Sequence, residues 1–304
     1  MIRPQAILVL IVVLIVVLSG ASTVAYNAVT ERDRSARQVG PVAVTPDVIA
    51  TATGVPVIAP SPTPTPDLTA KPTLVPTETP VPRPTERPAP PRLANTAAGI
   101  SIDQGTSGRR EVALTFDAGA GRGYTEQILD LLAQEGVTAT FGVTGKWAEE
   151  HPDLMRRIVA DGHMVINHTY DHVSFTGDST RAGPLTPSQR EAQLARTEQV
   201  IANLTGYQTA PYFRFPYGDY DAEALEDIAA AGYPYAIRWS CDSLAWRGSS
   251  AGQIVQKCGE KAEPGAIILL HVDPIADYEA LPGLIDTLRA RDFQLVTVEQ
   301  LLQP

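Results

Sequence analysis

The chain has 304 residues and a formal net charge of −10, and 13 of its 26 prolines lie between positions 56 and 91. No run of Lys or Arg resembles a phosphate-binding face, so the composition argues against nucleic acid and against anionic polymers as partners. Because so proline-rich a segment cannot build a packed core, one folded domain of roughly 195 residues remains, large enough to be stable without disulfides.

The N-terminal segment has the composition of a membrane-inserting sequence. Residues 6–28 carry no charge, and their first half is almost wholly Ile, Val and Leu behind a single Arg3. A stretch of this length can span a hydrocarbon core of about 30 Å, while its most apolar part alone has the length of a signal-peptide core. We predict a transmembrane anchor or signal segment at residues 1–30, with the rest of the chain outside the cytoplasm. An uncleaved single-pass anchor and secretion after signal cleavage both stay open.

A linker follows at residues 31–109. Its repeated Thr-Pro and Val-Pro pairs favour extended polyproline II, which rises about 3.1 Å per residue and acts as a semi-rigid spacer. We predict a Pro/Thr-rich disordered stalk that holds the remaining domain, residues 110–304, away from the membrane.

The chain has two cysteines, Cys241 and Cys258. In an exported domain a disulfide between them could persist. Two free buried thiols fit equally well, because the sequence does not place their Cα atoms within bonding distance.

From residue 110 onward, short apolar runs alternate with segments whose apolar residues recur at helical spacing. This alternation predicts a parallel sheet, and about seven repeats fit a distorted (β/α) barrel better than an open doubly wound sheet. In chain order the predicted strands are residues 111–116, 138–143, 164–167, 212–215, 235–240, 266–272 and 294–298. The predicted helices between them are residues 124–134, 147–160, 186–204, 222–231, 252–258 and 278–289.

Polar side chains follow most of these strands. In a barrel the active site lies at the carboxyl ends of the strands, so such residues are the first functional candidates. They are Asp117 after the first strand, His168 and His172 after the third, Arg214 and Tyr217 at the fourth, Asp242 after the fifth, and His271 in the sixth.

These residue types suit hydrolysis at a metal site. His168 and His172 are four apart, which puts both imidazoles on one face of a helical turn, as a divalent metal needs. Asp117 could serve as a general base and His271 as the proton donor to a leaving amine. Each also has a structural interpretation: Asp117 as a helix N-cap, His271 as a hydrogen-bonded core histidine, and the histidine pair as surface residues.

As an ordered set, the motifs resemble those of the NodB-homology polysaccharide deacetylases, carbohydrate esterase family 4. The resemblance covers roughly residues 110–302 and implies a distorted (β/α) barrel that hydrolyses N-acetyl groups on chitin-like or peptidoglycan-like chains, or O-acetyl groups on xylan. The motifs are Thr115-Phe116-Asp117, Asn167-His168-Thr169-Tyr170-Asp171-His172, Arg214-Phe215-Pro216-Tyr217-Gly218, Asp242 with Trp246, and Leu269-Leu270-His271.

Matched by position, the resemblance implies a role for each motif residue. Asp117 resembles the catalytic base, and Arg214 the residue that orients it through an ion pair. His271 resembles the catalytic acid, and Tyr217 the residue whose backbone N–H helps to stabilise the oxyanion. The two histidines of the second motif, His168 and His172, resemble metal ligands.

The chain departs from the family pattern at two positions. Ala118 stands where the family usually has an aspartate that supplies the third metal ligand, so Asp117 or Asp171 is left as a substitute and weaker metal affinity is expected. Ala245 stands where an aspartate often tunes the catalytic histidine, a task that Asp242 would then take over. Trp246 keeps its place as an apolar wall for the sugar, or alternatively packs in the core.

The sequence thus predicts a membrane-held hydrolase that removes N-acetyl groups from an acetylated polysaccharide, with a divalent metal ion, Zn²⁺ first, as cofactor. Peptidoglycan is the first candidate because an anchored enzyme reaches only what lies within its tether. The alternatives are a catalytically silent glycan-binding module on the same barrel and an O-acetyl esterase.

Overall fold

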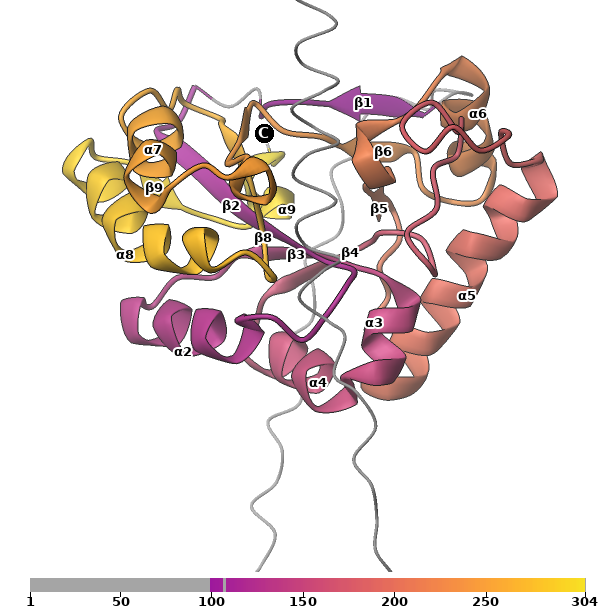
Figure 1. The fold of residues 1–304 in the computed structure, drawn as a ribbon, viewed down its shortest axis with the longest axis horizontal. Helices are drawn as coiled ribbons and strands as arrows, with labels where there is room; N and C mark the ends of the chain where they lie inside the picture. Colours follow the sequence, from indigo (N-terminus) through magenta and orange to yellow (C-terminus); the bar gives the residue numbers. More distant parts are fainter. Residues whose placement is uncertain (1–98, 106–107, 304) are drawn as a thin grey trace, which may run out of the picture. The chain divides into compact units, whose positions relative to one another are not determined.

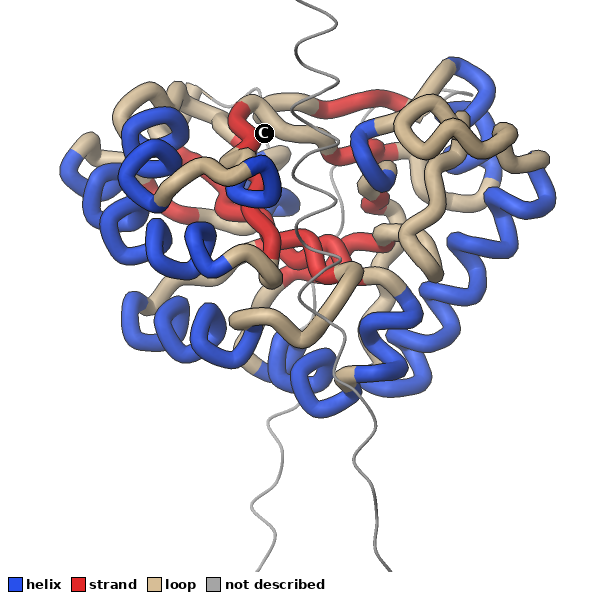
Figure 2. The backbone as a smooth tube through the Cα atoms, in the orientation of Figure 1, coloured by secondary structure: helices blue, strands red, loops and turns tan. Residues whose placement is uncertain are grey.

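The structure, a computed structural model, describes residues 99–105 and 108–303. The predicted anchor, residues 1–30, and almost all of the predicted stalk lie outside the described residues. Within the described ranges, no helix combines the length and apolar character required to cross a bilayer. The described residues form a curled sheet with helices on its outer side (Figures 1 and 2).

Strands and helices alternate along the chain. The strands are β1 (Ile100–Ile102), β2 (Glu111–Ala118), β3 (Thr140–Val143), β4 (Met164–Asn167), β5 (Tyr212–Phe213), β6 (Tyr235–Ile237), β7 (Cys241–Asp242), β8 (Ile267–His271) and β9 (Gln294–Leu295). The α-helices are α2 (Thr125–Glu135), α3 (Gly145–Glu150), α4 (Pro152–Ala160), α5 (Pro187–Thr205), α6 (Ala222–Ala230), α7 (Ala251–Ile254), α8 (Ile275–Ala290) and α9 (Val298–Leu301). Short 3₁₀ turns η2 (Pro216–Gly218) and η3 (Ala245–Arg247) and a π-helix η4 (Val255–Gly259) complete the set.

The strand order is β1-β6-β5-β4-β3-β2-β8-β7, and β9 adds a short pairing to the start of β2. Every ladder in this described sheet is parallel. Beyond β1, a single antiparallel bridge joins Gln104 to Ala266 at the start of β8. The result is a curled parallel sheet, consistent with a distorted barrel, as the sequence predicted.

Alternation along the strands decides which side chains face the inside of the curl. Val112, Leu114 and Phe116 of β2 join the large apolar cluster under the outer helices. Ala113 belongs instead to a separate inner cluster, which Val298 and Leu301 of α9 complete at the amino ends of the strands. Because side chains alternate between faces, Thr115 and Asp117 continue this inner row toward the carboxyl end. The ladder partners of Asp117, which are Gly142 in β3 and His271 in β8, lie on the same face of the sheet.

The predicted elements differ from the observed ones at several places. Strand β7 and helix α9 were not predicted as separate elements. Ile100–Ile102 was assigned to the stalk but forms β1, which pairs with β6. The single helix predicted at residues 147–160 is two helices, because Pro152 opens a new one at its N-terminal position. The predicted helix at residues 252–258 is a short α-helix that continues as a π-helix.

The two cysteines form a disulfide. Cys241 of β7 and Cys258 of η4 are bonded, with their Cα atoms 5.7 Å apart. The bond ties the edge strand of the sheet to the helix that covers it. It settles the alternative that the sequence left open.

Candidate active site

The centre of the site is a buried ion pair between Asp117 and Arg214. Arg214 Nη1 donates to Asp117 Oδ1 at 2.8 Å, and its Nε and Nη2 donate to the carbonyl oxygens of Ile237 and Arg238. Arg214 is fully buried and Asp117 is 7% exposed. Burial alone would raise the pKa of Asp117, but the charges of Arg214, His168 and His271 hold it below its ordinary value. Asp117 is therefore ionised and fixed in orientation at neutral pH.

Gly142 makes room for this carboxylate. It lies opposite Asp117 in the β2–β3 ladder. A Cβ built at position 142 would overlap with Asp117 Oδ1, so any larger residue there would displace the carboxylate. The glycine is therefore a condition for the Asp117–Arg214 pair.

His168 directs one ring nitrogen into the site. Its Nδ1 lies 2.9 Å from the carbonyl oxygen of Arg214, which can only accept, so Nδ1 carries the proton. Nε2 then carries a lone pair and lies 3.5 Å from Asp117 Oδ2. It is buried with no hydrogen-bond partner among the described residues. Burial lowers the pKa of His168. A neutral imidazole oriented in this way is the form that binds metals.

His172 reaches the same place from a loop. Its backbone has a left-handed φ of 61°, and its N–H donates to Thr169 Oγ1. The imidazole packs edge-on against His168, with ring centroids 4.9 Å apart, and against Tyr217 at 4.7 Å. Burial, with a contribution from His168, lowers the pKa of His172 to about 3. The two predicted metal ligands are thus adjacent and neutral.

The donor set suits a cation only in part. The unpartnered Nε2 of His168 beside His172 is the expected feature of a pair of imidazole ligands. Yet across the described residues no three His, Cys, Asp or Glu side chains group as a full metal site. Ala118 is fully buried in the outer apolar cluster, and Asp171 is exposed, with its backbone N–H on Gln193. Asp117 is therefore the carboxylate nearest the histidine pair.

His271 faces Asp117 from the neighbouring strand. The two residues are direct partners in the β2–β8 ladder. The His271 backbone N–H donates to Asp277 Oδ2 at 2.9 Å, and its ring Nδ1 lies 3.8 Å from the same oxygen. Burial would lower the pKa of His271, but the carboxylates of Asp277, Asp117 and Asp242 raise it above its ordinary value. Asp277 is a site residue that the sequence analysis missed.

Asp242 and Trp246 occupy the loop after β7. Asp242 Oδ1 accepts from the Leu244 backbone N–H at 2.8 Å, so its nearest task is to shape this loop. Trp246 is 54% exposed, which excludes the alternative of a core aromatic. Ala245 is buried in the outer apolar cluster.

Apolar side chains rim the carboxyl end of the strands. Tyr217, Trp246 and Ile275 are the large apolar residues that stand out as exposed in the described part of the chain. They follow β5, β7 and β8. Arg214 comes directly after β5, while Asp242 and His271 are the last residues of β7 and β8. The loop before α5 is fastened beside Tyr217 because Asp219 accepts from Ser174 Oγ and from the Ser179 backbone and hydroxyl.

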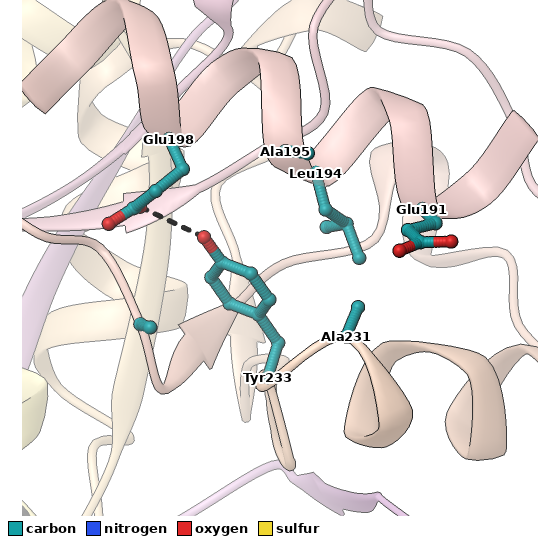
Figure 3. A pocket seen from close by; sticks show the side chains of 7 residues that line it. Glu191, Leu194, Ala195, Glu198, Ala231 and Tyr233 are labelled. Atoms are coloured by element: carbon teal, nitrogen blue, oxygen red, sulfur yellow. Dashed lines mark hydrogen bonds between the residues drawn. The ribbon is translucent and has the colours of Figure 1, made fainter. Parts of the chain in front are cut away.

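A separate pocket of about 200 Å³ lies between α5 and the segment before β6 (Figure 3). Glu198 on its wall accepts from Tyr233, whose hydroxyl in turn accepts from the Asn167 side chain. Asn167 Oδ1 accepts from the Thr169 N–H, in the turn that joins the two histidines. The pocket contains none of the predicted site residues. Its polar wall is linked by these hydrogen bonds to the loop that carries His168 and His172. Its lining residues are Glu191, Leu194, Ala195, Glu198, Ala210, Ala231 and Tyr233.

Comparisons with known proteins identify the family of the chain. A family model described as polysaccharide deacetylase matches residues 104–236. The chain is 33% identical over 204 residues to a peptidoglycan-N-acetylglucosamine deacetylase of Bacillus cereus, covering 66% of this chain and 70% of the relative. It is 33% identical over 215 residues to a chitooligosaccharide deacetylase of Rhizobium leguminosarum bv. trifolii, covering 66% of this chain and 96% of the relative.

Solved structures show the same fold. A peptidoglycan N-acetylglucosamine deacetylase matches with a TM-score of 0.61 at 30% identity, covering 67% of this chain and 92% of that one. A CE4 family pseudoenzyme from Bacillus anthracis also matches with a TM-score of 0.61, at 26% identity, covering 68% of this chain and 70% of that one.

The curled parallel sheet brings a buried Asp-Arg pair and three histidines together at its carboxyl edge. This arrangement is that of a hydrolase of the (β/α) barrel class. The chain belongs to the polysaccharide deacetylase (NodB homology) family, carbohydrate esterase family 4. The resemblance seen in the sequence motifs is therefore confirmed, and so is the enzyme class.

Proposed function

We propose that this chain removes N-acetyl groups from a cell-envelope or extracellular polysaccharide, with peptidoglycan as the first candidate and chitin-like chains as the second. The observation that carries the proposal is the convergence of Asp117, Arg214 and His271 beside the two loop histidines. Relatives named for deacetylation of peptidoglycan N-acetylglucosamine and of chitooligosaccharides support this choice of substrate.

The reaction is amide hydrolysis, and each step has a residue suited to it. Asp117, held ionised by Arg214, takes a proton from water as the water oxygen bonds to the acetyl carbon. The carbon–nitrogen bond then breaks, and His271, whose pKa is raised, donates a proton to the departing amine. The products are acetate and a free amino group on the sugar.

Two residues on the rim would bind the reacting group. We assign the Tyr217 backbone N–H to the oxyanion, in a turn that holds Tyr217 at a left-handed φ of 61°. Removing one such donor typically costs about 3 kcal/mol of transition-state stabilisation. Trp246, exposed beside Asp242, would form the apolar wall for the sugar ring.

A divalent cation, proposed as Zn²⁺, would be held by His168 and His172, with Asp117 as the nearest carboxylate. When bound it supplies positive charge that polarises the acetyl carbonyl and lowers the pKa of water. Because Ala118 provides no ligand, we expect weak binding that tightens in Ala118→Asp. Zinc titration by calorimetry tests this directly, and tight stoichiometric binding that is no tighter in the variant would refute it.

The N-terminal sequence supports a location at the cell membrane. Residues 6–28 are uncharged and long enough to span the bilayer, and the Pro/Thr-rich stretch at residues 31–109 would act as the stalk. An anchored catalytic domain outside the cytoplasm would then meet cell-wall glycan within its tether. Fractionation of cells before and after protease treatment tests the location: membrane-bound antigen that is cut from outside is the expected result.

The decisive experiment measures acetate released from a panel of acetylated glycans by the purified full chain, with several divalent ions. The panel includes peptidoglycan, chitooligosaccharides and O-acetylated xylan. We expect release from an N-acetylated glycan and its loss in His271→Ala. Release from acetylated xylan alone would replace the proposal with an O-acetyl esterase.

A catalytically silent glycan-binding module is the second candidate. Ala118, Ala245 and the similarity to a CE4 family pseudoenzyme favour it. The buried Asp117–Arg214 pair argues against it, because binding alone has no use for a base and its orienting partner. Glycan binding without acetate release under any ion would select this candidate.

A further inference from the structure

Asp277 is a fully buried carboxylate that points at the catalytic histidine. It lies in the first turn of α8 and is the acidic residue of that turn. Its Oδ2 accepts the backbone N–H of His271 at 2.9 Å. This bond ties the helix that follows β8 to the last residue of the strand.

The imidazole and the carboxylate each have an unsatisfied atom. His271 Nδ1 and Asp277 Oδ1 are both buried without a hydrogen-bond partner in the described part of the chain. Nδ1 lies 3.8 Å from Asp277 Oδ2, beyond hydrogen-bond range but within reach of a small side-chain rotation. A buried imidazole N–H that reaches this carboxylate gains free energy, because a buried polar group without a partner is costly.

This contact decides which ring nitrogen can act. With Nδ1 buried against Asp277, the ring's remaining nitrogen, Nε2, is the one left for the substrate, and the His271 side chain is 26% exposed. A carboxylate at Nδ1 fixes the tautomer and the ring orientation, and it stabilises the imidazolium form. Both effects favour proton donation from Nε2.

Other carboxylates near His271 are already engaged. Asp117 is paired with Arg214, and Asp242 accepts from the Leu244 N–H in its own loop. Both act on His271 through charge. Asp273, two residues after His271, accepts the Gly121 N–H through Oδ1 and also interacts with His271 through charge. His168 and His172 are the nearby groups of like charge when protonated. Asp277 alone among these four carboxylates bonds the His271 backbone.

We propose that Asp277 is the residue that positions His271 for proton donation, an inference that rests on the proposed deacetylase function. Asp277 does not touch substrate, so it is a positioning residue. It also lies at a helix N-terminus, where any carboxylate adds some stability. The test must therefore separate positioning from helix stabilisation.

The test compares Asp277→Asn with Thr297→Ala in the full chain. Asparagine keeps an oxygen for the His271 N–H but removes the charge beside Nδ1. We expect kcat to fall at least about tenfold, within the range of general acid catalysis, with KM changed less than about twofold. The alkaline limb of the kcat–pH profile should move to lower pH. Thr297→Ala removes the cap of α9 at the opposite end of the sheet, so it lowers stability but leaves kcat and the pH profile unchanged.

A folded Asp277→Asn variant with the kcat and pH profile of the parent overturns the inference. If the parent chain releases no acetate, the proposed function fails, but the contact is still measurable by NMR of ¹⁵N-labelled histidine. Loss of the Asp277 carboxylate should then lower the His271 titration midpoint and change its tautomer ratio. An unchanged His271 resonance would reject the role of Asp277 independently of activity.

Discussion

Histidines on the two sides of this site have pKa values shifted in opposite directions. On the base side, formed by β2 to β5 and the loop after β4, the pKa values of His168 and His172 are lowered by burial. On the acid side, formed by β7, β8 and α8, burial acts in the same direction, yet the pKa of His271 is raised. The difference lies in the carboxylates, because Asp277 bonds the backbone of His271 and Asp242 adds its charge from β7.

The comparison shows how one cavity shifts the pKa values of its imidazoles in opposite directions. A lowered pKa favours the neutral ring that can bind a cation, while a raised pKa favours the protonated ring that can donate. On the base side the Asp117 charge is largely taken up by Arg214, so burial dominates the neighbouring histidines. On the acid side no arginine or lysine has a hydrogen bond to the Asp277 carboxylate in the described residues, and its charge acts on His271.

The largest expected effect comes from breaking the base side at Asp117. Asp117→Asn removes the proposed general base, so acetate release should fall by about 10²- to 10⁴-fold. It also leaves the Arg214 guanidinium buried without its counter-charge, which should cost about 3–5 kcal/mol of unfolding free energy. Steady-state kinetics and urea unfolding measure the two effects.

Asp130→Asn is the matched control. Asp130 also accepts from an arginine, Arg157, but the Asp130 side chain is 55% exposed. An exposed pair contributes about 0–1 kcal/mol, so both kinetics and stability should stay close to the parent. If Asp117→Asn retained more than about a tenth of the parental rate, the assignment of the base would be wrong.

The next effect tests whether the acid side depends on its disulfide. Replacing Cys241 and Cys258 by alanine opens a loop of 17 residues, and loop-closure entropy predicts a loss of about 3 kcal/mol. Because Cys241 directly precedes Asp242, we expect KM to rise through the Trp246 loop, while Asp117 and its partners stay in place. Thermal unfolding and kinetics with and without reductant measure this.

Reductant should lower the stability of the parent to that of the double variant and leave the variant unchanged. Equal stability of the parent with and without reductant would show that the acid side holds without this bond.

The site residues that could be predicted from the sequence are those that lie on or directly after strands. Asp117 and His168 end inward-facing rows, and a period of two along a strand makes their convergence predictable. Asp277 is six residues beyond His271 and on a helix, so no strand or helix period links the two. Their contact depends on how α8 packs, which is a tertiary fact.

The fold shows the same division between local and tertiary signals. The alternation of strands and helices predicted the parallel sheet, because hydrophobic periodicity is local. β1 has three residues and follows a proline-rich stretch, so it has too little periodicity to be recognised, and only its pairing with β6 defines it. The break before Pro152 was predictable, since proline favours the first position of a helix.

A smaller effect tests whether burial alone favours the neutral form of a histidine in this fold, at a position outside the site. His163, just before β4, accepts the Ala139 N–H through Nδ1, and its Nε2 is buried without a partner in the described part of the chain. Burial lowers the pKa of His163 from 6.5 to about 4. Between these values the unfolded chain binds the proton and the folded chain does not, so stability is complete above pH 6.5 and falls as the pH falls.

A shift of one pKa unit corresponds to about 1.36 kcal/mol. The free energy of unfolding should therefore fall by roughly 2 kcal/mol between pH 7 and pH 5 because of His163. His163→Asn keeps an acceptor at the position of Nδ1 for the Ala139 N–H but does not titrate, so urea unfolding should show a smaller loss for the variant by that amount. Thr297→Ala, destabilised without a titrating group, should keep the pH dependence of the parent. A pH dependence in His163→Asn identical to that of the parent would show that burial at this position does not select the neutral imidazole.

The smallest expected effect concerns Trp246, at the exposed edge of the acid side. Trp246 is exposed, and the Arg247 guanidinium lies 4.6 Å from its ring centroid. If this ring packs on the sugar, Trp246→Ala should raise KM by about 2- to 13-fold, the equivalent of about 0.5–1.5 kcal/mol, and leave kcat unchanged. Because the side chain is largely outside the core, the unfolding midpoint should stay at the parental value. A fall in kcat with unchanged KM would mean that Trp246 helps to orient His271. The assignment of sugar binding to Trp246 and of proton donation to His271 as separate tasks would then be wrong.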